Sequence, residues 1–577
     1  METNSVSQVT SGYMGSCEAD TNRRSGWWER NLGNAVKLCA ANLVTVANVD
    51  LAKRIGIVDM GSGSARLVVY EFERQRWYRL TDEIREGVRL GEGFAASGRL
   101  SGEAINRALD ALKLYTDYAS ATKLGKLLVI ATSAVREAAN SAEFLGKLKD
   151  FDLEFVVLSG EDEARYGALA VANSFKLSNA WVMDLGGGSA QLSRLEDRVF
   201  QGGAAYPLGY VRMTEQFLRH ERTSDSEVRD LEKCVKATLG KTLRQVERSN
   251  RPLIAMGGTI RNLAKAAQKA EGYPLDMLHG YFLTRQKLEV LIERLLESPA
   301  AERGKISGIH SDRADAILGG ALVYRTVMRE AGLEGVFISG QGVREGAFYR
   351  QFLPEQSDHL LPDVRSFSVQ NLFAHYPQPI DHTEHVKRLS KQLFELLEPL
   401  HGYGSAELEL LNAAATLHDI GMAVNYFDHH KHSAYLILSG QMPGFSHREH
   451  VLIALLTQYH RKGDPKLGAY KALLEPDDDL RLTRLAACLR LAEYLERSRA
   501  GRVRNLEVSI DLRSVTLRLI ADDTPHVELW EAAKQGEIFK KAFGRELNLE
   551  AGVLKRSATS QDRRLSTPDG KTKRNKH

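Results

Sequence analysis

Two short stretches of this 577-residue chain combine an aspartate with closely spaced glycines and serines. In the first, Asp59 precedes the loop Gly61-Ser62-Gly63-Ser64, and in the second, Asp184 precedes the loop Gly186-Gly187-Gly188-Ser189. Glycines let a backbone approach a ligand closely, and the exposed amides of such a loop suit phosphate oxygens. An aspartate beside a bound phosphate can hold Mg²⁺. The recurrence of this unit predicts two loops that together hold a phosphate group and a metal ion.

Each loop follows a short apolar run that predicts a buried strand, at residues 55–58 and 180–183. Two further apolar runs, 252–256 and 335–338, also end in small residues, and Gly257 and Gly258 follow the first of these. In a parallel or mixed sheet the carboxyl ends of the strands gather around one crevice. We therefore predict an α/β fold with two similar halves around a cleft, in which Gly257 and Gly258 join the phosphate-binding loops.

Five further motifs accompany these loops, three of them between the two loops and two after the second. They are Arg89-Leu-Gly-Glu-Gly93, Thr132-Ser-Ala-Val-Arg136, Ser159-Gly-Glu-Asp-Glu163-Ala-Arg165, Met256-Gly-Gly-Thr259 and Arg313-Ala-Asp-Ala-Ile-Leu-Gly-Gly-Ala321. Together with the two loops, they resemble the exopolyphosphatase / guanosine pentaphosphate phosphohydrolase (Ppx/GppA) family. This resemblance implies two ribonuclease H-like domains of the actin-like ATPase superfold, at 53–180 and 181–352. Four prolines indicate a linker at 353–380. The resemblance to the longer members of the family implies an all-α HD-like domain at 381–502 and a small α+β domain at 503–550.

The resemblance also implies an activity. The expected reaction is hydrolysis of a phosphoanhydride, which releases terminal orthophosphate from inorganic polyphosphate or converts pppGpp to ppGpp. Glu163 is then the general base, Asp184 and Asp59 hold Mg²⁺, and a monovalent cation is a further expected cofactor. Arg89 and Arg136 lie in loops beside these motifs and are expected to clamp the phosphate.

Three residues depart from the family pattern. Gln191 stands where the family has a glutamate, Gly63 stands for an asparagine and Gln341 for a glycine. Glutamine can orient water but can neither accept a proton nor neutralise Mg²⁺, so Gln191 leaves open a catalytically weak sensor that binds polyphosphate or (p)ppGpp. A sugar or acid kinase shares the superfold but is less favoured, because the motifs around Glu163 and Arg313 indicate the phosphatase branch.

The segment 381–502 is rich in histidine, and its Leu417-His418-Asp419-Ile-Gly421 motif resembles the HD phosphohydrolase signature. This resemblance implies a second divalent metal held by His385, His418, Asp419 and Glu493. The alternative is a helical domain without metal that shapes a channel for a long polyanion and helps to form a homodimer.

The composition restricts the other function classes. The net charge is +4, and most of the excess lies in residues 555–577, so a nucleic-acid partner is not expected. We predict a disordered basic tail at 551–577 and a loosely ordered extension at 1–52. No window is apolar enough for a membrane span, so no membrane association is expected. The four cysteines show no metal or disulfide spacing, which is typical of a cytoplasmic protein.

Overall fold

The structure is a computed structural model that describes residues 53–151, 153–377 and 379–553. The predicted extension at 1–52 lies outside the described residues, as does the predicted tail apart from 551–553. Those three residues end the last strand, so the small C-terminal domain extends three residues beyond its predicted boundary at 550.

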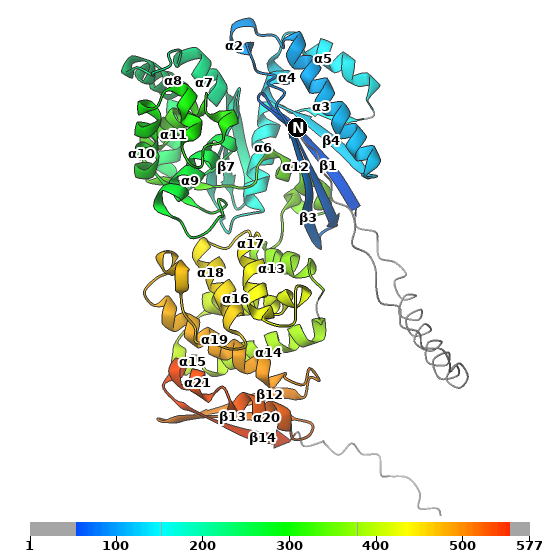
Figure 1. Ribbon diagram of the computed structural model, residues 1–577, viewed down its shortest axis with the longest axis vertical. Coiled ribbons are helices and arrows are strands. Elements are labelled where there is room, and N and C mark those ends of the chain that lie inside the picture. The colour runs from blue at the N-terminus through cyan, green and yellow to red at the C-terminus, as the bar shows by residue number, and fades with distance from the viewer. Residues whose placement is uncertain (1–52, 152, 378, 554–577) are drawn as a thin grey trace, which may run out of the picture. The chain divides into compact units, whose positions relative to one another are not determined.

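The first sheet has the strand order β3-β2-β1-β4-β5. Its strands are β1 (Lys53–Met60), β2 (Ala65–Glu73), β3 (Trp77–Glu86), β4 (Lys126–Ala131) and β5 (Glu154–Val157). Strand β1 pairs antiparallel with β2 and parallel with β4, so both the first glycine loop and the end of β4 lie at one edge of the sheet. Helix α3 (Gly102–Ala121) buries its apolar side against this sheet (Figure 1).

The second sheet repeats this arrangement. Its order is β10-β11-β9-β6-β7-β8, in which β6 pairs antiparallel with β7 and parallel with β9. The strands are β6 (Ala180–Leu185), β7 (Ala190–Glu196), β8 (Val199–Tyr206), β9 (Leu253–Met256), β10 (Phe282–Thr284) and β11 (Gly335–Ile338). Five helices share a hydrophobic core with this sheet (Figure 1): α7 (Tyr210–Phe217), α8 (Asp225–Ser249), α9 (Gly258–Glu271), α10 (Arg285–Glu297) and α11 (Ile317–Glu330). The predicted fold class, two similar α/β halves followed by a helical region, is therefore confirmed.

Two helices join the halves instead of following the predicted boundary. Helix α6 (Gly160–Ala172) precedes the second sheet in the chain but packs on β7 and β8. Helix α12 (Val343–Phe352) comes from the end of the second half but packs on β1 and β2 of the first. The two helices also contact each other, at Gly346 of α12 and Tyr166 of α6. The predicted boundary at 180/181 therefore separates the strands of the first sheet from those of the second. It does not separate the helices, because α6 and α12 each pack on the sheet of the other half.

The predicted linker at 353–380 contains a helix, α13 (Val364–Ala374), which is a correction. Its prolines flank this helix and do not interrupt it, and the Asp363 side chain caps it by accepting from the Ser366 amide. Asn371 on α13 accepts a hydrogen bond from the Tyr78 amide of β3 at 2.7 Å. The segment is therefore a packed element.

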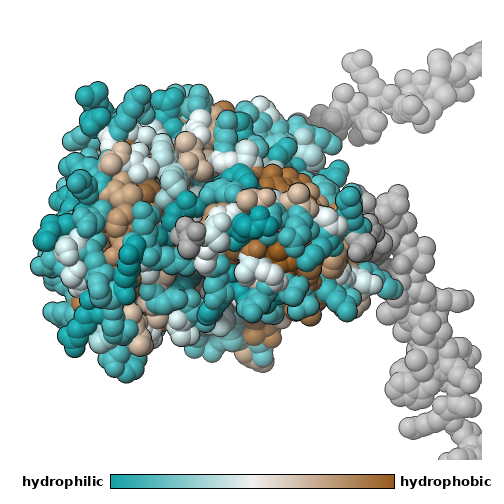
Figure 2. Space-filling view, turned by 90° about the horizontal axis from the view of Figure 1, so that it is seen from above, coloured by the Kyte–Doolittle hydropathy of each residue, from teal (hydrophilic) through white to brown (hydrophobic). Residues whose placement is uncertain are grey.

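After α13 the described chain forms a helical domain and then a small α+β domain. The helical domain contains α14 (Ile380–Leu396), α15 (Glu398–His401), α16 (Ser405–Leu417), α17 (His429–Ser439), α18 (His447–Tyr459) and α19 (Asp478–Leu495). The small α+β domain has the sheet order β12-β13-β14, from β12 (Val503–Ile510), β13 (Ser514–Ala521) and β14 (Glu546–Val553), with helices α20 (His526–Ala533) and α21 (Gly536–Phe543). No helix in the described part of the chain is both long and apolar enough to cross a membrane. Hydrophilic side chains cover most of the face seen in Figure 2.

The contact between α6 and α12 gives a stability prediction. We expect Gly346→Ala to lower the free energy of unfolding by about 2–3 kcal/mol, because the added Cβ would overlap the Tyr166 carbonyl oxygen and force the helices apart. The matched control is Gly240→Ala on α8, where a Cβ meets no atom within 4 Å and alanine is the better helix former. Thermal unfolding followed by circular dichroism tests the pair. Equal midpoints for the two variants would contradict the packing described here.

Candidate active site

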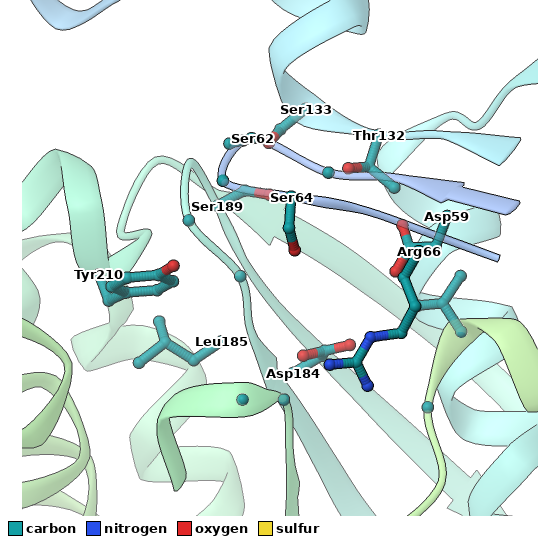
Figure 3. Close-up of a pocket in the computed structure, with 18 of the residues that line it drawn as sticks. Asp59, Ser62, Ser64, Arg66, Thr132, Ser133, Asp184, Leu185, Ser189 and Tyr210 are labelled. Atoms are coloured by element: carbon teal, nitrogen blue, oxygen red, sulfur yellow. Dashed lines mark hydrogen bonds between the residues drawn. The ribbon is translucent and has the colours of Figure 1, made fainter. Parts of the chain in front are cut away.

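A cavity of about 290 Å³ lies where the two halves of the α/β part meet. Its lining includes the Asp59 and Asp184 carboxylates at the ends of β1 and β6, together with Glu163 of α6. In Figure 3 Ser62 and Ser64 of one loop lie across from Ser189 of the other, and the Arg66 side chain extends into the cavity. The structure thus brings together the two loops that the sequence predicted to act as a pair.

The two glycine loops have the same internal geometry. The Gly61 amide donates to the Ser64 carbonyl at 3.1 Å, and the Gly186 amide donates to the Ser189 carbonyl at 2.9 Å. These two amides are therefore committed to the turns, which corrects their predicted role as phosphate donors, although both glycines line the cavity. The other amides of the two loops, at residues 62–64 and 187–189, remain the candidate hydrogen-bond donors to phosphate.

Neighbouring backbone fixes the orientation of each loop. The Ser62 and Gly63 carbonyls accept hydrogen bonds from the amides of Gly91 and Arg89, at 2.8 and 2.9 Å. In the second loop, the Gly186 and Gly187 carbonyls accept from the first residues of α7 at 3.0 Å. Because these carbonyl oxygens are engaged elsewhere, an anion in the cavity is not exposed to them.

The same cross-strand position carries different side chains in the two halves. Asp59 on β1 pairs with Arg66 on β2, whereas Asp184 on β6 pairs with Gln191 on β7. Cross-strand partners place their side chains on one face of the sheet, so each aspartate has a fixed polar neighbour. Gln191 is buried, donates from Nε2 to Ser189 Oγ at 2.7 Å, and has no hydrogen-bond donor to its Oε1 among the described residues. That free acceptor lies beside Asp184 rather than in the cavity lining.

Positive charge converges on the cavity from several elements. Five arginines line it, against the three carboxylates: Arg66, Arg85, Arg261, Arg313 and Arg344. Helices α9 and α12 also begin at its wall, and the N-terminus of a helix carries positive partial charge and free amides. Gly257 before α9 has φ 98°, and a side chain there would meet Asp184 Oδ1 at 2.7 Å. This site suits a multiply charged anion.

Glu163 is held by an arginine. Arg136, at the end of α4 (Ser133–Glu137), donates from Nη1 to Glu163 Oε2 at 2.9 Å and to the Leu158 carbonyl at 2.9 Å. Arg136 is not among the residues that line the cavity. In this structure Arg136 therefore positions Glu163 and partly neutralises it, and its role as a phosphate clamp stays a prediction.

Burial is the main cause of the pKa shifts of the three carboxylates in the cavity. It raises the pKa of Glu163 to about 7, against the opposing effect of Arg136, and Asp184 and Asp59 raise it further. Burial also raises the pKa of Asp184 to about 6, opposed mainly by Arg261, and raises the pKa of Asp59, opposed mainly by Arg344. A carboxylate that titrates near neutrality suits a general base.

Two more predicted residues lie outside the cavity lining. The Arg89 side chain is exposed, and only its backbone contributes, with φ 45° and the hydrogen bond to Gly63. Gly188 packs against the other loop, because a Cβ there would lie 2.7 Å from Ser133 Oγ and 3.1 Å from Ser62 Oγ. Glycine at this position thus permits the close approach of the two halves.

The sequence reasoning missed most of the cationic lining. Arg66 follows Asp59 at the spacing at which Gln191 follows Asp184, so the repeat itself was an available signal. Arg344 lies 3.8 Å from Asp59, and its Nε is buried without a hydrogen-bond acceptor in the described part of the chain. Arg261 follows the Gly257-Gly258 motif by one helical turn and was also overlooked.

In the helical domain, three of the four predicted metal ligands come together. His418, Asp419 and Glu493 are buried side by side, with His418 Nε2 3.3 Å from Glu493 Oε2. His385 does not join them, which is a correction, because its Nε2 binds the Val503 carbonyl at 3.0 Å. His382, one turn earlier on α14, takes that position instead, with its Nε2 3.4 Å from that of His418.

Two family models together match most of the described chain. The sequence model of the Ppx/GppA phosphatase family matches residues 68–355, and that of Ppx/GppA phosphatase domain III matches residues 364–528. Among solved structures, the Ppx/GppA family member of Aquifex aeolicus is 27% identical, with 53% of this chain and 99% of that chain covered at a TM-score of 0.46. An exopolyphosphatase from Cytophaga hutchinsonii is 22% identical, with 52% and 98% covered at a TM-score of 0.49.

The close packing of Gly258 against Arg313 predicts how anion binding depends on the start of α9. We expect Gly258→Ala to weaken tripolyphosphate binding about tenfold, because a Cβ there would overlap the Arg313 guanidinium and displace it from the cavity. Isothermal titration calorimetry measures this change. The variant Arg313→Ala is expected to lose a similar amount, and the double variant no more than either single one. Additive losses would contradict a shared cause.

Proposed function

This chain belongs to the Ppx/GppA phosphatase family, and we propose that it hydrolyses the terminal phosphoanhydride of inorganic polyphosphate. The observation that carries this proposal is the buried Glu163 carboxylate facing an arginine-lined cavity between two glycine loops. Binding and proton transfer are thereby combined in one site. The steps below follow from the chain's own residues.

The terminal phosphate enters as an anion. Its oxygens accept from the loop amides between Gly61 and Ser64 and between Gly186 and Ser189, and the lining arginines offset the charge of the following phosphates. Asp59 and Asp184 supply hard carboxylate oxygens that line the cavity, which is the donor set that Mg²⁺ prefers, and such an ion would neutralise phosphate charge. The site residues therefore fit the expected metal.

Glu163 performs the proton transfer. In its ionised form it takes a proton from a water molecule, whose oxygen attacks the terminal phosphorus in line with the bridging oxygen. The bond between that phosphorus and the bridging oxygen breaks, orthophosphate is released, and the shortened chain carries the new negative charge. The arginines of the lining stabilise this charge as it develops.

A second hollow favours a polymeric substrate over pppGpp. A space of about 870 Å³ shares Arg261, Asn262 and His310 with the cavity and continues to Lys265 and to residues 438–441 of the helical domain. Among the described residues, its lining carries no phenylalanine, tyrosine or tryptophan on which a guanine base would stack. Lys265 pairs with Asp276 of the same lining, so Arg261 supplies the remaining positive charge, and a flexible polyanion can extend from the cavity into this space without a base-specific pocket.

Gln191 supports the second candidate, a polyphosphate or (p)ppGpp sensor with little turnover. Gln191 lies opposite Asp184 on the neighbouring strand, and its neutral amide has no negative charge that could help to bind Mg²⁺ as a carboxylate would. Retained binding with absent turnover would identify this alternative. Because Ser189 Oγ can donate as well as accept, a glutamate at 191 would fit the same hydrogen bond.

Orthophosphate release tests the proposed function. We expect the wild-type protein with Mg²⁺ to release orthophosphate from long-chain polyphosphate faster than from pppGpp. Glu163→Gln preserves shape but cannot accept a proton, so kcat should fall by about 10²–10⁴ with little change in KM. Release by the variant at the wild-type rate would exclude Glu163 as the base. No release by the wild type, with tight binding, would favour the sensor.

The pH dependence tests the role of Arg136. Glu163 must be ionised to act, so kcat/KM should fall as the pH drops below about 7. Arg136 lowers the pKa of Glu163, so Arg136→Gln should move this acidic limb to higher pH. The control is Arg165→Gln on the same helix as Glu163, because Arg165 pairs with Glu161 at the surface. A raised KM with an unmoved limb would show that Arg136 binds phosphate instead.

A further inference from the structure

One tyrosine in the wall of the cavity has no part in the proposed reaction steps. Tyr210 is the first residue of α7, and its ring packs in the hydrophobic core of the second half, with 9% of the residue exposed. It lines the cavity, and in Figure 3 its hydroxyl points toward the side on which Ser64 and Ser189 lie. A buried ring thus carries its one polar atom to the space where the phosphate is expected.

The Tyr210 hydroxyl has no hydrogen-bond partner among the described residues, and it is open to the cavity. Two other tyrosines near the site differ in this respect. The Tyr324 hydroxyl donates to the Met256 carbonyl at 3.0 Å, and the Tyr206 hydroxyl lies 3.0 Å from Thr242 Oγ1. The hydroxyl of a buried tyrosine usually has a partner, so the partner of Tyr210 is expected to be a group that enters the cavity.

Neighbouring elements hold Tyr210 in this position. Its amide donates to the Gly186 carbonyl at 3.0 Å. Helix α11 packs closely against it, because a Cβ on Gly319 would lie 3.0 Å from the Tyr210 carbonyl oxygen and a Cβ on Gly320 3.1 Å from Tyr210 Cβ. The Arg313 guanidinium lies 5.2 Å from the centroid of the ring, within the range of a cation–π contact. Residues of one sequence motif therefore fix both the backbone and the ring.

Gly63 of the first loop leaves room for the hydroxyl. A Cβ at position 63 would lie 3.3 Å from the Tyr210 hydroxyl oxygen, and apart from its chain neighbours it would meet no other atom within 4 Å in the described part of the chain. The φ angle of Gly63 lies outside the left-handed region, so the backbone itself does not require glycine. An asparagine, which the family pattern has here, would add an amide group beyond that Cβ and compete with the hydroxyl for space. Glycine at 63 and tyrosine at 210 therefore form a matched pair.

The hydroxyl also lies beside candidate donors to phosphate. Because the Cβ of residue 63 is two bonds from the amide nitrogen of that residue, an atom in contact with this Cβ is close to the loop amides as well. A phosphate oxygen has several lone pairs and can accept from an amide and from the hydroxyl together. Arg313 lines the same cavity, so the tyrosine ring places a cation and a neutral donor side by side.

We propose that the Tyr210 hydroxyl donates a hydrogen bond to the phosphate held by the first glycine loop, in the space that an asparagine at position 63 would otherwise enter. The inference rests on the proposed function, because it takes the phosphate to lie between the loops. In this chain, one donor to that phosphate then comes from the second half of the fold, across the cavity from Gly63. The ligand class is a terminal phosphate, as at the end of a polyphosphate chain.

Calorimetric titration with tripolyphosphate tests this inference. Full-length Glu163→Gln with Mg²⁺ is the parent, because without the proposed base it should not consume the ligand. Adding Tyr210→Phe removes only the hydroxyl, and we expect Kd to rise about tenfold, since the lost hydrogen bond goes to a charged group. Tyr206→Phe is the matched control, because its hydroxyl faces Thr242 outside the cavity lining, and it should bind as the parent does.

An exchange of the two residues tests their pairing. In the same parent, Gly63→Asn should weaken binding about tenfold, because the asparagine and the hydroxyl compete for one space. Tyr210→Ala alone should weaken binding by a similar factor, but the two substitutions together should bind more tightly than either one alone. Losses that multiply in the double variant would overturn the pairing.

Unchanged binding in Tyr210→Phe would overturn the hydrogen bond to phosphate, as would an equal loss in Tyr206→Phe or a parent that does not bind tripolyphosphate. Thermal unfolding checks that Tyr210→Phe is folded, which is expected because its ring and the contact with Arg313 remain. In the wild-type background Tyr210→Phe should raise KM with little change in kcat, unlike Glu163→Gln. Absence of turnover in the wild type, with the calorimetric results as expected, would contradict the proposed function and leave the binding role of Tyr210 standing.

Discussion

The burial of three carboxylates in one cavity is the constraint on which the active site depends. Asp59, Asp184 and Glu163 each have a raised pKa because the cavity shields their carboxyl groups from much of the surrounding water, and nearby carboxylates add to the effect. Such a group is stable only with compensating charge, which the surrounding arginines and helix N-termini supply. The cavity is thus poised to take up a cation and a polyanion together.

The two similar halves of the fold each contribute equivalent elements to this cavity. Each half delivers one aspartate at the end of a central strand and one glycine loop after it, and the exchanged packing of α6 and α12 holds the halves together. The proposed base, Glu163, belongs to α6, which lies on the second sheet, while Arg136 belongs to the first half. Any change in the relative position of the halves therefore alters both the distance between the two glycine loops and the pairing of Glu163 with Arg136, on which the pKa of Glu163 depends.

Features that lie within one contiguous motif could be predicted from the sequence. The paired aspartates and glycine loops are contiguous motifs, so their meeting in one cavity could be predicted, as could Glu163 through the family resemblance. Of the arginines in the lining, only Arg66 had a signal in the sequence, its place in the repeat, whereas Arg261 and Arg344 reach the cavity from two separate helices, α9 and α12. The sequence analysis named His385, whereas the structure places His382 in that position, because the phase of a helix is not visible in a lone motif. The hydrogen bond of His385 to the Val503 carbonyl shows that its side chain lies away from the buried cluster in the helical domain. Arg136 lies in a family motif, but its partner is set by tertiary contact.

The most direct test of the central claim is a crystal structure of Glu163→Gln with Mg²⁺ and tripolyphosphate. The account predicts density for the terminal phosphate between Ser62–Ser64 and Gly187–Ser189, within hydrogen-bond distance of the loop amides. The substituted side chain at position 163 should lie on the side of this phosphorus opposite the bridging oxygen, with a water molecule between them. Tripolyphosphate bound outside this cavity, or bound in it with the chain rather than the terminal phosphate between the loops, would contradict the account.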